Sequence, residues 1–585
     1  MDKTQSSGES PSSSVPSKPS EKRVPVADRA SAPGPTALDA WWGRTLRTPA
    51  RLRVWSTIAP LFVVGLAAFV RVYNLGWPDS LVFDETYYVK DALSMSRLGY
   101  EAAWPDGANT AINAGQTEGF LSEAEFAVHP PLGKWIISLG FGIWGRGNPF
   151  GWRAAVALCG ILVVLLVYLI AKHLFHSIVL ASIAGTLIAI DGQAIVMSRT
   201  AILDGPLTLL CLAGVGAVLI DRWWLGRHDR LRMPGRTVLW KRPWLVVAGL
   251  LFGLACATKW SGVWFLLAFA LYVVILDILE RRRQRPSRAI GRESTGREIP
   301  GEAIAGEAIA GETIAGETIT VAEPSPTPGL AAPAVLQALI TSATLAFTAA
   351  VAYLATWTGW FLSPGASDRS WAEQHGALWT GVFAWVPPII QNFIHHHLAM
   401  LAFNVNLSTP HGYQANPLTW LLYTQPLSMY TRTTSGGIGP CGETVCRETA
   451  WLMVNPIIWW ASVAAVVVIL VRFVLRRERR LGVILLGVAA GYLPWLLFIN
   501  RTIFQFYSII FEPYLILALT AVLGYLLGRR SDPRRVRVFG ITVVAGFLLV
   551  CVAVSAFFYP LWVASPPVTN GFIDWHLWLV SWRWE

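Results

Sequence analysis

The sequence predicts an all-α polytopic membrane protein, with about eleven transmembrane helices and with short helices in the loops on its exoplasmic side. Composition is the first reason: 54% of the 585 residues are hydrophobic, 14% are charged, and the mean hydropathy is +0.47. A water-soluble fold needs more polar surface than this. The second reason is that apolar runs near the length of a spanning helix, about 20 residues, recur along the chain. The third is that basic loops alternate with weakly basic ones.

Eleven apolar runs are interpreted as spans. They lie at residues 57–73, 154–170, 178–197, 202–220, 243–257, 262–279, 334–361, 451–471, 482–499, 508–527 and 536–559. The run at 243–257 is short and has the least support. Leu132–Trp144 is also apolar but too short to span, and it is interpreted as an interfacial or re-entrant helix.

Positive charge between the runs sets the orientation of the predicted helices. Basic residues cluster in the N-terminal segment (Arg44, Arg47, Arg51, Arg53), after span four (Arg222, Arg227, Arg230, Arg232, Arg236, Lys241, Arg242), after span six (Arg281, Arg282, Arg283, Arg285), after span eight (Arg472, Arg476, Arg477, Arg479, Arg480) and after span ten (Arg529, Arg530, Arg534, Arg535, Arg537). Such loops stay in the cytoplasm. The N-terminus is therefore expected to be cytoplasmic, and residues 74–153 and 362–450 exoplasmic. The net charge of +11 follows from this topology, so no nucleic-acid partner is expected.

The predicted spans form two modules, residues 54–283 and residues 334–585. Residues 1–53 are expected to be a disordered cytoplasmic tail, since they are rich in Ser, Pro, Lys and Glu. Residues 284–333 contain the repeat GEAIA-GEAIA-GETIA-GETIT, which begins at Gly301. A period of five fits neither a helix nor a strand, so a flexible cytoplasmic linker is predicted. The Trp-rich exoplasmic tail after Pro560 is interpreted as an aromatic belt at the membrane interface: Trp575, Trp578, Trp582 and Trp584.

Two adjacent carboxylates, Asp84 and Glu85, lie just beyond the first predicted span, in the sequence FDETYY. Low dielectric and a neighbouring like charge can raise the pKa of a carboxyl group, as a site that needs a base requires. An ordinary solvated acidic turn explains the same spacing, because paired acids are common in loops. Spacing alone leaves both interpretations open.

A second motif in the same loop, HPPLGKW, begins at His129. The prolines Pro130 and Pro131 fix the backbone, and the glycine before Lys134 permits close approach. By itself the motif predicts a rigid turn that enters the short apolar helix.

Three basic residues, Arg71, Arg153 and Lys259, lie at the exoplasmic ends of predicted spans. Each alone is explained by a side chain that extends to water. All three on one face, beside the carboxylate pair, indicate a binding site for a lipid phosphate at the membrane surface.

Histidines and cysteines give further expectations. The run His395-His396-His397 is interpreted as a solvated or headgroup-facing strip, because consecutive histidines rarely face one metal ion. Cys441 and Cys446 share the second exoplasmic loop and can form a disulfide in an oxidising compartment. Sequence alone leaves their pairing open.

Six motifs follow one another along the chain: FDETYY, HPPLGKW, FGWRAAVALCGIL, SRTAILD, GLACATKWSG and NPIIWW. Together they resemble the protein O-mannosyltransferases, polyprenyl-phosphate-mannose-dependent enzymes of the GT-C superfamily. The resemblance extends from about Arg71 to Tyr514, without the linker. It implies an inverting glycosyltransferase that moves mannose from polyprenyl-phosphate-mannose to Ser or Thr hydroxyls of exported proteins, with its catalytic module in residues 54–283.

The resemblance also implies roles for individual residues. Asp84 is expected to be the catalytic carboxylate and Glu85 its functionally important neighbour. The other expected site residues are the donor phosphate-binding Arg71, Arg153 and Lys259, and the loop motif His129, Pro130, Pro131 and Lys134. In this scheme a carboxylate takes the proton of the attacking hydroxyl while cationic side chains hold the phosphate, so no metal or other cofactor is expected.

The chain departs from eukaryotic members of that family between spans seven and eight, where about ninety residues are too few for their β-trefoil MIR domain. In this it resembles bacterial members, which implies a multi-pass protein of a bacterial plasma membrane with an exoplasmic active site. The expected partners are the lipid donor, membrane lipids and secreted or translocating acceptor proteins, with the protein-export machinery as a further candidate.

Two other functions remain open at this point. Another GT-C enzyme, which transfers a lipid-linked sugar to a lipid or glycan, would keep the fold and the acidic loop. A membrane transporter has less support, because the chain shows no inverted repeat and no mid-span charges in paired halves.

Overall fold

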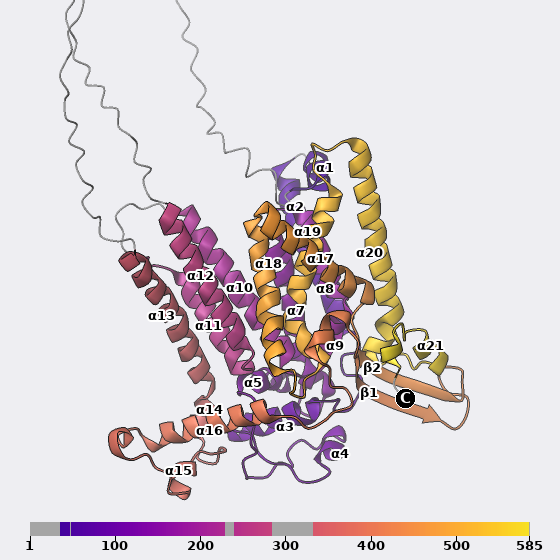
Figure 1. Cartoon of the computed structure of the whole chain (residues 1–585). Helices are drawn as coiled ribbons and strands as arrows, with labels where there is room; N and C mark the ends of the chain where they lie inside the picture. Colours follow the sequence, from indigo (N-terminus) through magenta and orange to yellow (C-terminus); the bar gives the residue numbers. More distant parts are fainter. Residues whose placement is uncertain (1–34, 47, 229–238, 284–330, 584–585) are drawn as a thin grey trace, which may run out of the picture.

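The computed structural model describes residues 35–46, 48–228, 239–283 and 331–583. Long helices lie side by side in a bundle, and short helices gather at one end of it, here called the loop end (Figure 1). The mostly helical class is confirmed. A two-stranded antiparallel sheet, β1 (Leu427–Ser435) and β2 (Val445–Leu452), adds to the predicted helices. The repeat that begins at Gly301 lies outside the described residues.

Eight helical segments in the described part of the chain are long and apolar enough to cross a membrane. They are α2 (Pro49–Val72), α7 (Pro149–Phe175), α10 (Asp204–Arg227), α12 (Gly262–Arg283), α13 (Ala331–Thr356), α17 (Pro456–Arg476), α18 (Gly482–Tyr492) with η6 (Leu493–Phe498), and α20 (Arg534–Val563). A ninth candidate is the pair α8 (Ile178–Ile190) and α9 (Gly192–Arg199), which is bent by 59°.

Two further predicted spans correspond to shorter helices, α11 (Pro243–Thr258) and α19 (Glu512–Leu527), of 16 residues each. A helix of that length reaches about 24 Å, which is less than the roughly 30 Å of a bilayer core. All eleven predicted runs are therefore helical, but the count of eleven spans stays a prediction.

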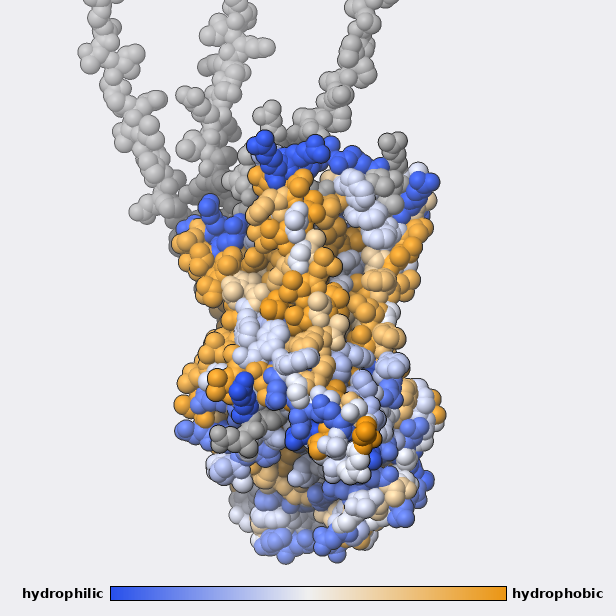
Figure 2. Space-filling model, turned by 90° about the vertical axis from the view of Figure 1, so that its right-hand side faces the viewer, coloured by the Kyte–Doolittle hydropathy of each residue, from blue (hydrophilic) through white to orange (hydrophobic). Residues whose placement is uncertain are grey.

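The surface of the bundle has the pattern of a membrane protein. On the face shown in Figure 2, hydrophobic side chains form a band between a hydrophilic end and the more polar loop end. Large apolar side chains on the long helices are exposed, for example Phe347 at 70% and Leu549 at 71%. Exposed apolar surface on this scale indicates contact with lipid.

The bend between α8 and α9 has its polar groups satisfied inside the protein. The Asp191 carboxylate accepts hydrogen bonds from the backbone nitrogens of Gln193 and Ala194, and so caps α9. On the other side of the bend, the Ser555 hydroxyl donates to the carbonyl of Ile190 at 2.8 Å. Interrupted helices are tolerated at membrane depth only where such partners exist.

Both long loops lie at the loop end (Figure 1). The first contains α3 (Glu85–Leu98), α4 (Ala108–Asn113), α5 (Leu132–Ser138) and α6 (Phe141–Trp144); the second contains α14 (Thr358–Leu362), α15 (Trp371–Gln374), η3 (Gly381–Phe383), α16 (Pro388–Asn406), η4 (Pro417–Leu422) and the hairpin. The predicted short helices are present. The longest helix of the second loop, α16, has 19 residues and runs across the direction of the long helices (Figure 1).

The N-terminal segment differs from the predicted disordered tail of residues 1–53. Ala37–Leu46 forms α1, at the end of the bundle opposite the loop end (Figure 1). Its start is capped because the backbone nitrogen of Thr36 donates to the Asp39 carboxylate at 2.8 Å. The same carboxylate accepts a hydrogen bond from the Ser177 hydroxyl at 2.6 Å, so α1 is held against the start of α8.

The tail after α20 packs on the protein more closely than an aromatic belt does. Trp575 and Trp578 are exposed, as that interpretation requires, but Trp582 is fully buried. The Trp582 indole donates to the carbonyl of Tyr423 at 2.8 Å, which explains its burial. Trp584 lies outside the described residues.

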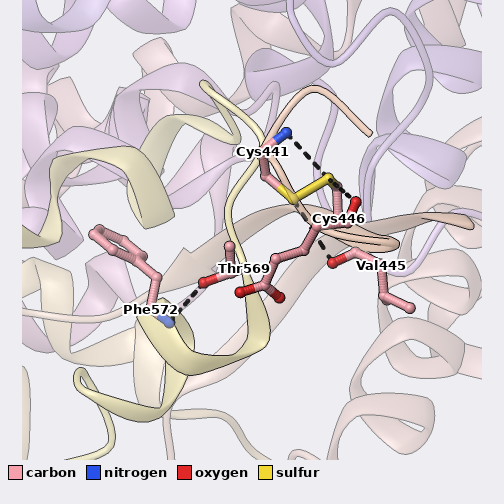
Figure 3. Close-up of a disulfide and its surroundings, with 6 residues drawn as sticks. Cys441, Val445, Cys446, Thr569 and Phe572 are labelled. Carbon is pink, nitrogen blue, oxygen red and sulfur yellow. Dashed lines mark hydrogen bonds between the residues drawn. A yellow bond between two sulfur atoms is a disulfide. The ribbon is translucent and has the colours of Figure 1, made fainter. Parts of the chain in front are cut away.

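A disulfide between Cys441 and Cys446 closes the tip of the hairpin (Figure 3). Their Cα atoms are 5.7 Å apart. The C-terminal tail passes beside this tip, where the backbone nitrogen of Phe572 donates to the Thr569 hydroxyl. The pairing that the sequence left open is present in the structure.

Candidate functional site

A cavity of about 210 Å³ lies at the loop end, between α12, α16, η6 and the residues that follow α11. Its polar lining consists of His129, Lys259, Ser261, Asn404 and Arg501. The rest of the lining is largely apolar: Trp260, Val263, Trp264, Leu401, Val405, Pro494, Trp495 and Phe498. The cavity therefore joins a small cationic region to a wall suited to a hydrocarbon chain.

Lys259 directly follows α11 and supplies much of the positive charge. Its Nζ lies 2.9 and 3.1 Å from the two carboxylate oxygens of Asp204, at the start of α10, and 4.0 Å from the centre of the Tyr507 ring. Burial lowers the pKa of Lys259, but the charge of Asp204 outweighs it and the net pKa is raised. The ammonium group therefore stays charged beside the cavity.

Asp84 immediately precedes α3, and its side chain makes no capping bond to that helix. Burial raises the pKa of Asp84 to about 6, although Lys259 lowers it, and Asp204 adds to the increase. Such a carboxyl group is mainly ionised at pH 7 and binds a proton more readily than a surface aspartate. These are the properties of a general base.

The residue before Asp84 fixes where α3 begins. Phe83 has a φ of 43°, in the left-handed region that non-glycine residues rarely adopt. Its ring packs edge-on against Phe504 and Phe506, with ring centres 5.9 Å from each. These contacts hold the FDETYY turn against η7 (Gln505–Ile510), which contains Phe506, and against the residue before it, Phe504.

Glu85 and Arg153 form a buried, two-pronged ion pair that does not line the cavity. Both contacts between the guanidinium and the carboxylate measure 2.8 Å. Arg153 also donates to the carbonyls of Pro78 and Ser80, and Glu85 accepts from the backbone nitrogen of Ala201. All of these bonds hold the turn before α3. The Arg153 guanidinium is thus held by groups of the protein, and its predicted contact with donor phosphate stays a prediction.

Arg71 is buried beside the bend between α8 and α9. Its guanidinium donates to the carbonyls of Ala189 at 2.9 Å and Ile188 at 3.2 Å, and to the Ser198 hydroxyl at 3.2 Å. The two carbonyls belong to the last turn of α8, which the bend leaves without helical partners. Arg71 thus caps α8 and does not line the cavity, and its predicted role at the donor phosphate stays a prediction.

Of the HPPLGKW motif, only its first residue, His129, lines the cavity. Pro130 and Pro131 lead into α5, where Lys134 is buried and lies 2.7 Å from Glu101 and 3.4 Å from Asp91. These ion pairs tie α5 to α3 and to the chain that follows it. Lys134 therefore stabilises the loop and does not line the cavity.

His129 and Arg501 complete the polar lining. Burial lowers the pKa of His129 well below its usual value, and Lys259 and other cations lower it further, so the imidazole is neutral. Arg501 donates from Nη2 to the Asn404 side chain at 3.1 Å, and its buried Nε has no hydrogen-bond partner among the described residues. Asn404 in turn donates to the carbonyl of Val128, which precedes His129. A guanidinium with a free donor beside an ammonium group suits a phosphate.

Of the predicted site residues, His129 and Lys259 line the cavity, and Asp84 is near enough to Lys259 for that charge to lower its pKa. Arg71, Arg153 and Lys134 bond to other groups of the protein. Asp204, which bonds to Lys259, and Arg501, which lines the cavity, also belong here, although neither is among the site residues expected from sequence. Asp204 is the last residue of the SRTAILD motif, and Arg501 is a solitary cation between predicted spans nine and ten. These two positions, the end of a motif and a lone cation between spans, were the sequence features that could have indicated a role in the site.

The three consecutive histidines of α16 do not gather around one point. The imidazole of His396 is buried and bonds to Asp368 at 2.9 Å, and that of His397 bonds to the Tyr353 hydroxyl at 2.8 Å. The interpretation as a solvated strip is wrong for His396. Within the described ranges, no three His, Cys, Asp or Glu side chains are arranged to hold a metal ion.

Sequence comparison matches both halves of the chain to one family. Residues 61–289 match the dolichyl-phosphate-mannose-protein mannosyltransferase family, and residues 389–582 match the C-terminal four TMM region of protein-O-mannosyltransferase. Curated relatives cover almost the whole chain. The polyprenol-phosphate-mannose–protein mannosyltransferase of Mycobacterium tuberculosis (strain CDC 1551 / Oshkosh) is 30% identical over 97% of each chain. That of Mycolicibacterium smegmatis (strain ATCC 700084) is 28% identical over 91% of this chain and 94% of its own.

A solved structure shares the fold. The protein O-mannosyltransferase Pmt1-Pmt2 complex of S. cerevisiae, bound to the sugar donor, superposes with a TM-score of 0.65 over 94% of this chain and 95% of the matched chain. The two sequences are 15% identical, so this similarity concerns architecture alone.

Proposed function

This chain belongs to the protein O-mannosyltransferase family, and we propose that it transfers mannose from polyprenyl-phosphate-mannose to Ser or Thr hydroxyls of exported proteins. The observation that carries the proposal is that Asp84 lies within electrostatic reach of Lys259, which lines a cavity with cations at one end and an apolar wall. A base, a phosphate site and a lipid groove are the parts that this reaction needs.

The donor lies with its phosphate at the polar end of the cavity. Lys259 and Arg501 supply positive charge, and the unpartnered Nε of Arg501 provides a donor for a phosphate oxygen. The apolar side chains of Trp264 and Phe498 contact the first part of the polyprenyl chain. Charge on the leaving phosphate increases as its bond to the sugar breaks, so fixed cations there lower the barrier.

The transfer is a single displacement at the anomeric carbon. The acceptor oxygen attacks that carbon, the bond from carbon to phosphate oxygen breaks, and the lipid phosphate leaves as a monoester. Asp84 takes the proton of the attacking hydroxyl. Attack opposite the phosphate inverts the configuration of the anomeric carbon. Glu85 and Arg153 act indirectly, because their buried ion pair holds the turn that carries Asp84.

The site faces the exoplasm in this proposal, and the N-terminus lies in the cytoplasm of a bacterial cell. The basic clusters after every second predicted span support that orientation. Acceptor proteins would then reach the site after they cross the membrane, which makes the protein-export machinery a reasonable neighbour.

The test is transfer by purified full-length protein in vesicles. Polyprenyl-phosphate-[³H]mannose is supplied with a Ser/Thr-rich peptide, and label is expected on the peptide and to be released by β-elimination. Arg501→Gln should raise the KM for donor by about 10- to 100-fold, the value of a hydrogen bond to a charged group. Arg97→Gln is the control, because that side chain is exposed and pairs with Glu118 away from the cavity. Label that moves only to lipid or glycan acceptors would contradict the proposed acceptor class.

A further inference from the structure

Helix α16 has the opposite amphipathicity to that of a helix on a water-soluble surface. Its 19 residues include no Asp, Glu, Lys or Arg. Five apolar side chains at helical spacing point away from the protein: Ile390, Ile394, Leu398, Leu401 and Val405, with exposures of 39, 36, 59, 47 and 52%. At about 100° per residue they form one stripe roughly 80° wide.

Three polar side chains of α16 point inward instead, whereas Asn406, at the end of the helix, is exposed. Gln391, Asn392 and His396 are buried, and each is hydrogen-bonded to the loop beneath. Asn392, for example, accepts from the backbone nitrogen of Ala372 and donates to the carbonyl of Arg369. A helix in water would turn these groups outward. The inward polar and outward apolar faces therefore indicate an apolar medium outside the stripe.

The loop before α16 extends the same surface. Leu378, Trp379, Val382, Phe383 and Trp385 are all exposed, with Val382 at 80% and Trp385 at 77%. Gln391 holds this segment in place, since its side chain accepts from the backbone nitrogen of Trp379. Exposed tryptophan beside an apolar helix is typical of a membrane interface.

The stripe is continuous with the surface that α12 presents to lipid. Leu401 and Val405 line the same cavity as Trp264, in the first turn of α12. The next turns of α12 expose Leu267 at 55% and Leu271 at 61%. In Figure 1, α16 lies across the ends of the long helices.

We propose that α16 and residues 378–385 lie in the lipid leaflet at the loop end, with the apolar stripe of α16 inserted among acyl chains. The partner of this surface is the bilayer itself. Leu401 and Val405 then form a lipid-facing wall of the donor cavity, so a polyprenyl chain passes from the leaflet to Lys259 without crossing water. That last step rests on the proposed function, whereas insertion of the helix does not.

Depth-dependent fluorescence quenching tests the insertion directly. Cysteine is placed at Leu398, labelled with bimane, and the full-length protein is incorporated in phosphatidylcholine–phosphatidylglycerol vesicles with doxyl-labelled lipids. The matched control is Phe403→Cys, which is on the same helix, 42% exposed and about 140° away from Leu398. Unsubstituted protein gives the background from the four free cysteines, of which three are buried.

At Leu398, doxyl lipid is expected to quench the label strongly, whereas aqueous iodide should quench it little. At Phe403, the ratio of lipid quenching to iodide quenching should be smaller. Ile394→Cys should repeat the Leu398 result if one label perturbs the fold. Quenching of Leu398 by iodide as strong as that of Phe403 would overturn the proposal. Protection from both quenchers would do so too, because it would mean that a second copy or another protein covers the stripe. Neither readout needs mannose transfer, so failure here is distinct from failure of the proposed function.

Discussion

At the residue scale, Asp84 and Glu85 differ because of what each carboxylate contacts. Glu85 is saturated by Arg153 and by two backbone nitrogens, those of Val82 and Ala201. Asp84 makes no capping bond, and the charges of Lys259 and Asp204 act on its pKa. Of the two adjacent carboxylates, Glu85 is therefore a fixed anchor, whereas Asp84 is available for the proposed role as base.

The pKa of Asp84 makes the reaction sensitive to pH. Only the ionised carboxylate can accept a proton, and its pKa is raised to about 6. The deprotonated fraction, and with it kcat/KM, is expected to be nearly constant above pH 7 and to fall about tenfold per pH unit well below 6. Initial rates between pH 5 and 8.5 measure this, with recovery of full activity on return to pH 7.5 as the control for unfolding. A profile that stays flat down to pH 5 would exclude Asp84 as the base.

The Glu85–Arg153 pair is expected to matter for folding. Arg153→Met leaves a buried carboxylate without its partner, at a cost of about 3–5 kcal/mol. The double variant Arg153→Met/Glu85→Gln should be less destabilised than the sum of the two single variants. Thermal unfolding in detergent measures both effects. Arg153→Met protein with a normal Tm and a raised KM for donor would return this arginine to the phosphate site.

The basic residues at the ends of predicted spans show why the site was only partly predictable from sequence. Arg71, Arg153 and Lys259 have the same sequence context, a cation at the end of an apolar run. Whether such a group meets a phosphate, a carboxylate or free carbonyls depends on segments far away in the chain. Arg71 meets α8, over a hundred residues later, and Arg153 meets Glu85, 68 residues earlier. Arg501 was not among the expected site residues because no motif surrounds it.

At the scale of elements, hydrophobicity predicted the long helices and the short helical region at 132–144, but it missed α16. Each of the eleven apolar runs contains helix, since burial in lipid imposes one length and one composition. In α16 the apolar positions are mixed with histidine and asparagine, so no continuous run marks it. The hairpin was not predicted because a single pair of strands in a long polar loop gives only a short alternating pattern.

The bend between α8 and α9 gives a prediction at this scale. Arg71→Leu removes donors from two carbonyls of the last turn of α8, at a cost of about 1–3 kcal/mol for each unsatisfied group. A lower yield of folded protein and a lower Tm are expected, with Arg71→Lys intermediate. Size-exclusion profiles and thermal scans measure the loss. If Arg71→Leu folds normally but binds donor weakly, the arginine belongs to the donor site after all.

At the scale of the whole molecule, topology decides where the chemistry occurs. The described loops that contain Asp84 and α16 share one end of the bundle, and α1 lies at the other (Figure 1). Positive charge follows every second predicted span, which predicts that the loop end is exoplasmic.

Impermeant maleimide tests this orientation in intact cells. A cysteine at Asn109, in the first long loop, is expected to react, whereas one at Gly306, in the repeat linker, should react only after the membrane is opened. The unsubstituted protein controls for its own free cysteines. Labelling of Gly306→Cys in intact cells would reverse the orientation and place the site in the cytoplasm.

The most direct test of the whole account compares donor binding with turnover in Asp84→Asn. The substitution keeps the shape of the side chain but removes the proton acceptor. Turnover of polyprenyl-phosphate-mannose is expected to fall by about 10²–10⁴, the usual contribution of a general base, while the affinity for donor changes little. Donor titration and single-turnover rates on the purified, folded variant give both quantities. Near-normal turnover in Asp84→Asn would contradict the assignment of Asp84 as the base and the mechanism built on it.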